Sequence, residues 1–236
     1  MTTVDTPIAR TLCDEEVVII PGEVALLGRL RMPEHPIGIV IFAHGCGSDR
    51  HSPRNRFVAD ALAGHRLATL TIDLLTPSEV IEGGKAFDVE LLGRRLIAAH
   101  RWLRAVPSLR EFPVGYFGTG SEAPVALWAA AEPRSRVRAV VVRGGRPDLA
   151  GGRLVNVLAP TLYLVGGQDC RVRVENRRAA ESMLCEHRIT ELTSAAPLLE
   201  SQLSRRVAYL AAVWFTENLT SKPLTSAASE PERRAG

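Results

Sequence analysis

Apolar and polar positions follow two different periods along this chain. Short runs of apolar and β-branched residues have the length and composition of strands, and they cover residues 17–20, 26–31, 37–43, 67–72, 114–117, 137–142, 161–165 and 189–192. Longer segments repeat their apolar residues with a helical period, and they cover residues 54–63, 89–105, 123–131, 175–184 and 202–218. Strand and helix therefore alternate.

The run at residues 37–43, Ile-Gly-Ile-Val-Ile-Phe-Ala, is apolar at nearly every position. Strands of this kind are buried on both faces, as in a parallel sheet that helices cover on each side. The first two strands have no helix between them, so we expect them to form an antiparallel edge. The pattern predicts an α/β fold with a mostly parallel central sheet of about eight strands and helices on both faces. Ligands of such sheets bind beyond the carboxyl ends of the strands.

Length and composition favour a single domain. A chain of 236 residues, 46% of them hydrophobic, is long enough for one sizeable core and short for two ordinary domains. We expect this domain to cover residues 16–219 after an N-terminal extension of residues 1–15. Residues 220–236 are rich in Ser, Ala, Pro and charge without an apolar period, which is typical of a disordered tail.

Charge and cysteine content indicate which partners and which cellular compartment to expect. The formal net charge of +3 is small and the arginines are spread along the chain, so we expect no nucleic-acid partner. The four cysteines lie far apart without a C-x-x-C pair, which indicates free thiols in a reducing compartment. The N-terminus lacks the apolar core of a signal peptide, and no later stretch is apolar for long enough to cross a bilayer. We expect a cytoplasmic protein without membrane contact; the sequence does not fix its oligomeric state.

Three motifs follow predicted strands and carry a family resemblance. They are HGCGS at residues 44–48, GTGSE at 118–122 and VGGQD at 165–169. With these motifs in this order, the chain resembles the dienelactone hydrolase branch of the α/β-hydrolase superfamily over roughly residues 16–215. The resemblance implies an α/β-hydrolase fold and an active site with a nucleophile on a sharp strand-to-helix turn, a histidine base and an acid that orients it.

The residues at the implied catalytic positions depart from this chemistry. The resemblance places Gly120 at the nucleophile, where it has no side chain to attack with, and Glu122 at a small position where a side chain normally crowds the turn. The histidine would fall at Ala196 or Pro197, and neither can accept a proton. The acid is retained as Asp169, which could equally cap a turn or the following helix. The sequence therefore predicts a degenerate triad.

Other residues near these positions have alternative roles. The resemblance implies oxyanion donors at the amides near Cys46 and of Ser121. Ser121 is either a nucleophile shifted by one residue or a residue of the first helical turn. A Cys46 thiolate beside backbone amides would have a lowered pKa, but Cys46 could also be a small loop residue that replaces serine. His44 belongs to the usual HG loop of the family and is expected to be structural.

The stretch Gly118-Thr-Gly-Ser-Glu-Ala123 also fits the G-x-G-x-x-A dinucleotide pattern between a strand and a helix. It lies halfway along the chain, however, and the next strand ends in an arginine, Arg143, with no acid to hold a ribose. The hydrolase pattern accounts for the stretch better. We therefore expect no cofactor and no metal.

Three hypotheses about function follow. The leading one is a hydrolase-fold pseudoenzyme that binds a small molecule, or catalyses a cyclase, isomerase or lyase reaction in which Glu122 or Asp169 moves protons. The second is an active esterase or lactone hydrolase with a rearranged site that uses Ser121 or Cys46. The third is a non-catalytic interaction protein whose pocket is filled.

Overall fold

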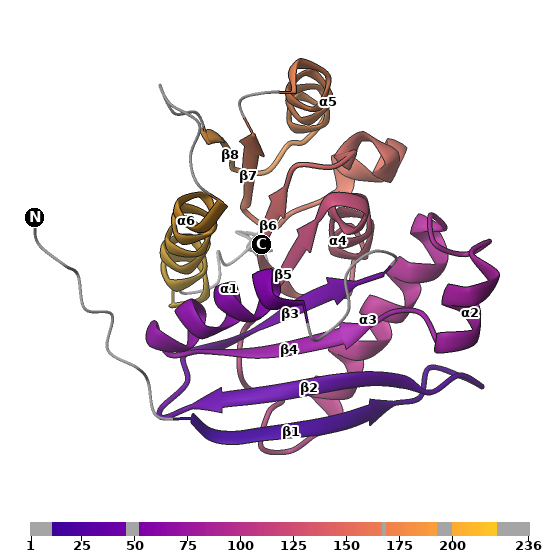
Figure 1. The fold of residues 1–236 in the computed structure, drawn as a ribbon, viewed down its shortest axis with the longest axis vertical. Coiled ribbons are helices and arrows are strands. Elements are labelled where there is room, and N and C mark those ends of the chain that lie inside the picture. The colour runs from indigo at the N-terminus through magenta and orange to yellow at the C-terminus, as the bar shows by residue number, and fades with distance from the viewer. Residues whose placement is uncertain (1–10, 46–51, 167–168, 193–199, 221–236) are drawn as a thin grey trace, which may run out of the picture.

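The computed structural model describes residues 11–45, 52–166, 169–192 and 200–220, and these form one eight-stranded sheet with helices on both faces (Figure 1). The strands are β1 (Thr11–Ile19), β2 (Leu26–Pro33), β3 (Gly38–His44), β4 (Leu67–Asp73), β5 (Val114–Thr119), β6 (Val137–Arg143), β7 (Thr161–Gly166) and β8 (His187–Leu192). Their order across the sheet is β1-β2-β4-β3-β5-β6-β7-β8. The predicted α/β fold class is confirmed.

Helices cover the sheet in two layers. The helices are α1 (Pro53–Gly64), α2 (Pro77–Glu82), α3 (Val89–Ala105), α4 (Ala123–Ala130), α5 (Cys170–Glu181) and α6 (Glu200–Thr220), with 3-10 turns η1 (Gly120–Glu122) and η2 (Pro147–Asn156). Within β3, Ile39 and Ile41 pack in the cluster that includes α3 and α4, whereas Val40 and Phe42 pack in the cluster with α1 and α6. Successive residues of a strand face opposite sides, so the nearly uniform apolar run reflects burial on both faces.

The first two strands pair antiparallel, and β2 pairs antiparallel with β4, while the pairs from β4 to β8 are parallel. The antiparallel edge predicted from the missing helix is therefore confirmed. β1 begins at Thr11, so it overlaps the N-terminal extension expected for residues 1–15. The three consecutive acidic residues 14–16 hid the start of the strand, because they interrupt its apolar pattern.

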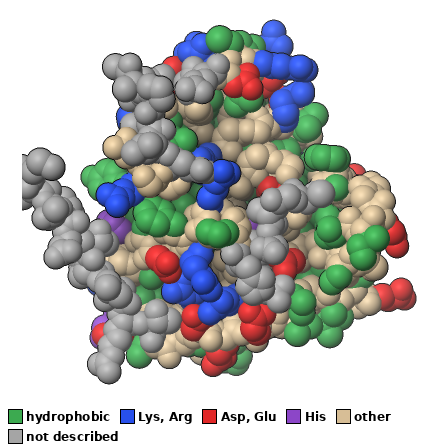
Figure 2. Space-filling view, in the orientation of Figure 1, with side chains coloured by type: hydrophobic (Ala, Val, Ile, Leu, Met, Phe, Trp, Pro, Cys, Tyr) green, Lys and Arg blue, Asp and Glu red, His purple; other side chains and the backbone are tan. Residues whose placement is uncertain are grey.

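Three further elements differ from the sequence prediction. The short α2 and the irregular η2 were not predicted, because neither carries a helical apolar stripe of useful length. Helix α5 begins at Cys170, five residues before the expected start at residue 175, since the Asp169 side chain caps its first turn. Helix α5 carries arginines but no lysine, and Figure 2 shows basic side chains gathered at the top of the molecule, where Figure 1 places this helix.

The carboxyl ends of the parallel strands meet at one edge of the sheet. His44 pairs with Asp73 at the ends of β3 and β4, and Thr119 pairs with Arg143 at the ends of β5 and β6. The loops that follow these strands therefore converge, as expected for the ligand-binding edge of an open α/β sheet.

In the part of the chain that the structure describes, no helix combines the length and the apolar character that crossing a bilayer requires. The cysteines described there, Cys13, Cys170 and Cys185, are free thiols, as the sequence predicted. The tail from residue 221 lies outside the described residues.

Candidate active site at the strand-to-helix turn after β5

The chain turns sharply between β5 and α4 through the three-residue turn η1. Gly120 stands at the apex with a φ of 60°, in the left-handed region that side chains disfavour. Gly118 makes the turn possible: a Cβ there would lie 2.6 Å from the carbonyl oxygen of Glu122 and 2.9 Å from Cβ of Ala126. The turn therefore has the tight, strained geometry of a nucleophile elbow.

The apex is open on the side of its missing side chain, as far as the described residues show. A Cβ built on Gly120 would meet no atom of the described residues within 4 Å. In an α/β-hydrolase the attacking side chain projects from this point of the turn. Here the backbone has the conformation that presents such a side chain, and the residue has none.

The loop after β6 packs directly against this apex. Gly144 and Gly145 both have positive φ, 58° and 70°, and a Cβ on Gly145 would overlap the carbonyl oxygen of Gly120. The buried Asn176 of α5 donates its side-chain amide to the Gly145 carbonyl over 3.3 Å. Two consecutive glycines are thus required where two loops touch. The pair Gly-Gly directly after a strand was the available sequence signal for this contact.

The Glu122 side chain does not force the turn open, although a side chain was expected to crowd the turn at this position, which normally carries a small residue. Its side chain is 3% exposed and turns toward the loop after β3. The Ser121 hydroxyl donates to Oε1 of Glu122 over 2.7 Å, and the backbone amide of Gly45 donates to the same carboxylate. A Cβ on Gly45 would lie 2.8 Å from that oxygen, so glycine at residue 45 makes room for the carboxylate.

Burial shapes the electrostatics of this carboxylate. Desolvation raises the pKa of Glu122 to about 7, although hydrogen bonds from the Ser121 hydroxyl, its own backbone and the Gly45 amide act in the opposite direction. A group with this pKa is present in both protonation states near neutral pH, which is what acid–base catalysis requires. The contact between Glu122 and Gly45 was not predicted, because it joins segments far apart in sequence.

His44 lies just before this contact, at the end of β3. Its ring is buried, and its Nδ1 lies 3.1 Å from the side-chain amide of Asn55 on α1. Its carbonyl accepts a hydrogen bond of 2.7 Å from Leu74 in the loop after β4. These contacts anchor the loop that carries Gly45.

Asp169 caps helix α5 and is exposed. Its carboxylate accepts hydrogen bonds from the backbone amides of Arg171 and Val172, over 2.9 Å and 3.1 Å. This is the capping role that the sequence left open beside the catalytic one. Cys46 and the implied histidine position at residues 196 and 197 lie outside the described residues. The structure thus brings Gly120, Ser121 and Glu122 together with Gly45.

The sheet order and the strained turn after β5 define a protein of the α/β-hydrolase fold. No family model matches the sequence. Among solved structures, the chain is 44% identical to a dienelactone hydrolase from Anabaena variabilis, with a TM-score of 0.83 over 88% of this chain and 98% of that one. The chain belongs to the dienelactone hydrolase family.

More distant structures share the fold. An esterase domain from a Rhodothermus marinus protein superimposes with a TM-score of 0.68 at 20% identity, over 88% of this chain and 100% of that one. Est1E from Butyrivibrio proteoclasticus does so with a TM-score of 0.63 at 13% identity, over 84% and 98%. At these identities the likeness extends to the fold alone.

The curated relatives bear a different name. Two Mycobacterium tuberculosis proteins, both named "Putative phosphoribosyl transferase", are 50% identical to this chain over 209 residues, which make up 88% of this chain and 47% of each relative. The chain therefore spans about half the length of the curated relatives it matches.

Proposed function

We propose that the turn after β5 forms a small-molecule site in which Glu122 transfers protons in a reaction that needs no acyl-enzyme, of the isomerase, cyclase or lyase type. The observation that carries the proposal is the buried Glu122 carboxylate, whose pKa is raised to about 7 two residues from the open apex at Gly120. In this proposal the pocket has lost the nucleophile and the histidine of an ester hydrolase.

The chemistry follows from the groups at the turn. Among the described residues, none fills the space at the glycine apex, where a hydrolase has its nucleophile. This room favours a ligand site over the filled pocket of an interaction protein. Glu122 as a carboxylate accepts a proton from a carbon next to a carbonyl group and returns it elsewhere on the substrate. The Ser121 amide, with an amide near Cys46, would stabilise the enolate oxygen.

Family membership supports a carbonyl-containing substrate such as a lactone. The transferase name of the curated relatives belongs to proteins about twice the length of the matched segment. The proposal therefore depends on the chemistry of the turn rather than on that name.

Replacing Glu122 with glutamine tests the proposal. The wild-type protein is incubated with a panel of lactones and keto acids in D2O. We expect it to exchange substrate hydrogens for deuterium at carbons next to the carbonyl group, and NMR measures the rate of this exchange. Loss of the proton-transfer group should slow this exchange by about 10²–10⁴-fold. The wild-type rate should rise with pH through about 7, because the carboxylate is the base and its pKa has this value.

Glu90→Gln is the matched control, since it removes an exposed carboxylate on α3 that pairs with Arg94. We expect Glu90→Gln to exchange substrate hydrogens at the wild-type rate. If no member of the panel exchanges, or if Glu122→Gln exchanges at the wild-type rate, Glu122 is not the base.

A hydrolase that uses Ser121 or Cys46 is the second candidate, and the 2.7 Å hydrogen bond from the Ser121 hydroxyl to Glu122 favours Ser121 as its nucleophile. A fluorophosphonate probe with mass spectrometry tests Ser121, and iodoacetamide tests Cys46. We expect no fluorophosphonate adduct, because the hydroxyl is one residue away from the apex of the turn. An adduct on Ser121, or selective alkylation of Cys46 over the other cysteines, would establish the hydrolase instead.

Restoring the missing groups should restore hydrolysis. Serine fits at Gly120, since no atom of the described residues lies within 4 Å of its Cβ, although the positive φ costs about 1–2 kcal/mol. We expect the double variant Gly120→Ser, Pro197→His to hydrolyse p-nitrophenyl acetate, and each single variant to remain near the wild-type rate. A folded double variant without hydrolysis would argue against an ancestral triad at these positions.

A further inference from the structure

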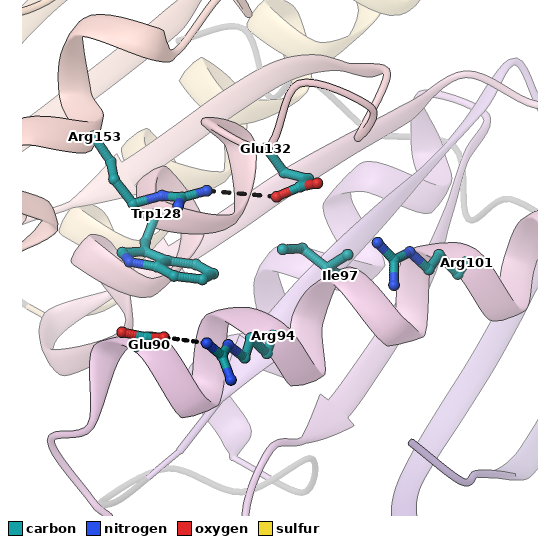
Figure 3. A pocket seen from close by; sticks show the side chains of 7 residues that line it. All are labelled: Glu90, Arg94, Ile97, Arg101, Trp128, Glu132 and Arg153. Carbon is teal, nitrogen blue, oxygen red and sulfur yellow. Dashed lines mark hydrogen bonds and ion pairs between the residues drawn. The ribbon is translucent and has the colours of Figure 1, made fainter. Parts of the chain in front are cut away.

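A groove runs along the outer side of α3 and α4, away from the turn after β5 (Figure 3). Its wider part has a volume of about 420 Å³, and most of its charges are paired. Arg94 pairs with Glu90, and Arg153 stacks 4.0 Å from the ring centre of Trp128 while it lies 3.5 Å from Glu132. Arg101 also lines this part, and Figure 3 shows it joined to none of the other side chains drawn.

A second cavity, of about 50 Å³, shares Ile97, Arg101 and Glu132 with this groove. This cavity lies near the amino ends of β5 and β6, opposite to the carboxyl ends that carry the candidate active site. The residues that line it come from α3, from β5 and from the connection between α4 and β6, and they include His100, Arg101, Arg104, Tyr116, Arg134 and Arg136.

Positive charge around this cavity is not balanced. Arg101, Arg134 and Arg136 have no ion pair among the residues that the structure describes. Arg104 donates to the backbone carbonyl of Arg110, which carries no net charge. The single lining acid, Glu132, already lies near Arg153 in the wider part of the groove. Four guanidinium groups therefore surround a space in which a bound anion would relieve their mutual repulsion.

The buried wall of the cavity is polar. His100 is 4% exposed and Tyr116 is 0% exposed, and Nδ1 of His100 lies 2.8 Å from the Tyr116 hydroxyl. Nε2 of His100 has no hydrogen-bond partner among the described residues, so it is available to a ligand. Burial, followed by the charge of Arg104, lowers the pKa of His100 to about 4. The proposed active site uses neither residue.

We propose that this cavity is a binding site for the phosphate group of a small molecule. Guanidinium groups bind phosphate oxygens through paired, charge-assisted hydrogen bonds, and four of them line the cavity with the Ser135 hydroxyl. Its volume exceeds the roughly 30 Å³ that one water molecule occupies in the liquid and suits a small oxyanion. The excess of arginines over acids distinguishes this cavity from the wider groove, where the acids already pair with arginines.

An adjoining cavity offers room for the rest of a phosphorylated molecule. It has a volume of about 290 Å³ and shares His100, Arg104 and Arg136 with the smaller one. A phosphate monoester could therefore place its phosphate among the arginines and its organic part along Phe112 and Pro113. The ligand is either free inorganic phosphate or such a monoester, and the two are separable by affinity.

Isothermal titration calorimetry with inorganic phosphate and with glycerol 3-phosphate tests the site, at an ionic strength fixed with chloride. We expect saturable binding of both, tighter for the monoester if the adjoining cavity contributes and equal for the two if the ligand is free phosphate. Arg104→Gln and Arg134→Gln should each weaken binding at least tenfold. Arg94→Gln, which changes an arginine of the same helix α3 outside this cavity, should bind as the wild type does.

NMR titration of the His100 ring provides a readout that does not depend on affinity. A bound anion offsets the charge of Arg104, so phosphate should raise the pKa of His100, and chloride at equal ionic strength should not. Absence of saturable binding at millimolar phosphate, equal affinity in all the arginine variants, or a His100 titration that phosphate leaves unchanged would overturn the proposal.

Discussion

Replacing Arg95 with methionine is expected to lower the free energy of unfolding by about 3–5 kcal/mol, because it leaves the carboxylate of Glu79 buried without its main partner. Arg95 and Glu79 are 6% and 5% exposed. Their two hydrogen bonds, of 2.6 Å and 2.8 Å, form a bidentate pair, and the guanidinium also donates to the carbonyl of Leu74 over 2.8 Å. The pair joins α3 to the segment after β4.

The same carboxylate also caps helix α2, so a Glu79 side chain displaced by the loss of Arg95 would weaken the start of this helix as well. Glu79 accepts from the backbone amide of Thr76 over 3.0 Å in a capping box, and from Lys85 over 2.9 Å. The hydrogen bond with Arg95 is the largest cause that holds the pKa of Glu79 far below its usual value of 4.5. The stability that depends on this shift is present above about pH 4.5 and is lost as the pH falls.

Urea unfolding at several pH values measures this prediction. The stability difference between wild type and Arg95→Met should be largest near pH 7. It should narrow below about pH 4.5, because the unfolded chain then protonates Glu79 and the advantage of the charged, paired carboxylate in the folded wild type falls. Arg94→Met on the same helix is the control, since its pair with Glu90 is exposed and contributes about 0.5 kcal/mol or less. Equal losses in the two variants would show that the buried pair contributes no more than a surface pair.

Replacing Gly145 with alanine is expected to destabilise the protein by about 2–5 kcal/mol, as the sum of left-handed strain and overpacking. Gly145 has a φ of 70°, and its Cβ would overlap the backbone carbonyl oxygen of Gly120. Backbone cannot move aside as a flexible side chain can. The turn after β5 must therefore shift, and with it Ser121 and Glu122.

Gly144→Ala provides the matched control. Gly144 also has a positive φ, 58°, but its Cβ would lie 4.0 Å from the nearest side-chain atom, Cγ1 of Val172. It should lose about 1–2 kcal/mol from strain alone. Thermal unfolding separates the two variants, and hydrogen exchange of lactone or keto-acid substrates should be impaired in Gly145→Ala far more than in Gly144→Ala. Indistinguishable variants would mean that the contact between the two loops is not tight.

The turn after β5 retains a costly geometry although its apex has no side chain. The positive φ at Gly120, the close approach at Gly118 and the contact with Gly145 all belong to a turn that presents a nucleophile. Among these close contacts lies Glu122, whose carboxylate the fold buries rather than exposes. A buried carboxylate with a pKa of about 7 supports the proposal that this turn carries a proton-transfer group.

Local pattern determined the architecture of this protein. All of the predicted strands occur. A uniformly apolar run such as the one in β3 is buried on both faces only when it lies between two layers of helices. The antiparallel pairing of β1 and β2 followed from their short connection. Asp169 was readable as a possible cap of a turn or of the following helix, although that helix begins five residues earlier than its apolar pattern indicated.

Only the tertiary structure decided the environment of the candidate site. The sequence marks Glu122 as an unusual residue in a tight turn, but its raised pKa depends on burial against Gly45, 77 positions earlier in the chain. The same holds for Gly145 against Gly120 and for Arg95 with Glu79, which meet through packing rather than through spacing. Burial and contact between distant segments set the pKa of a carboxylate and the room beside a glycine, and neither is a property of a residue and its neighbours in sequence.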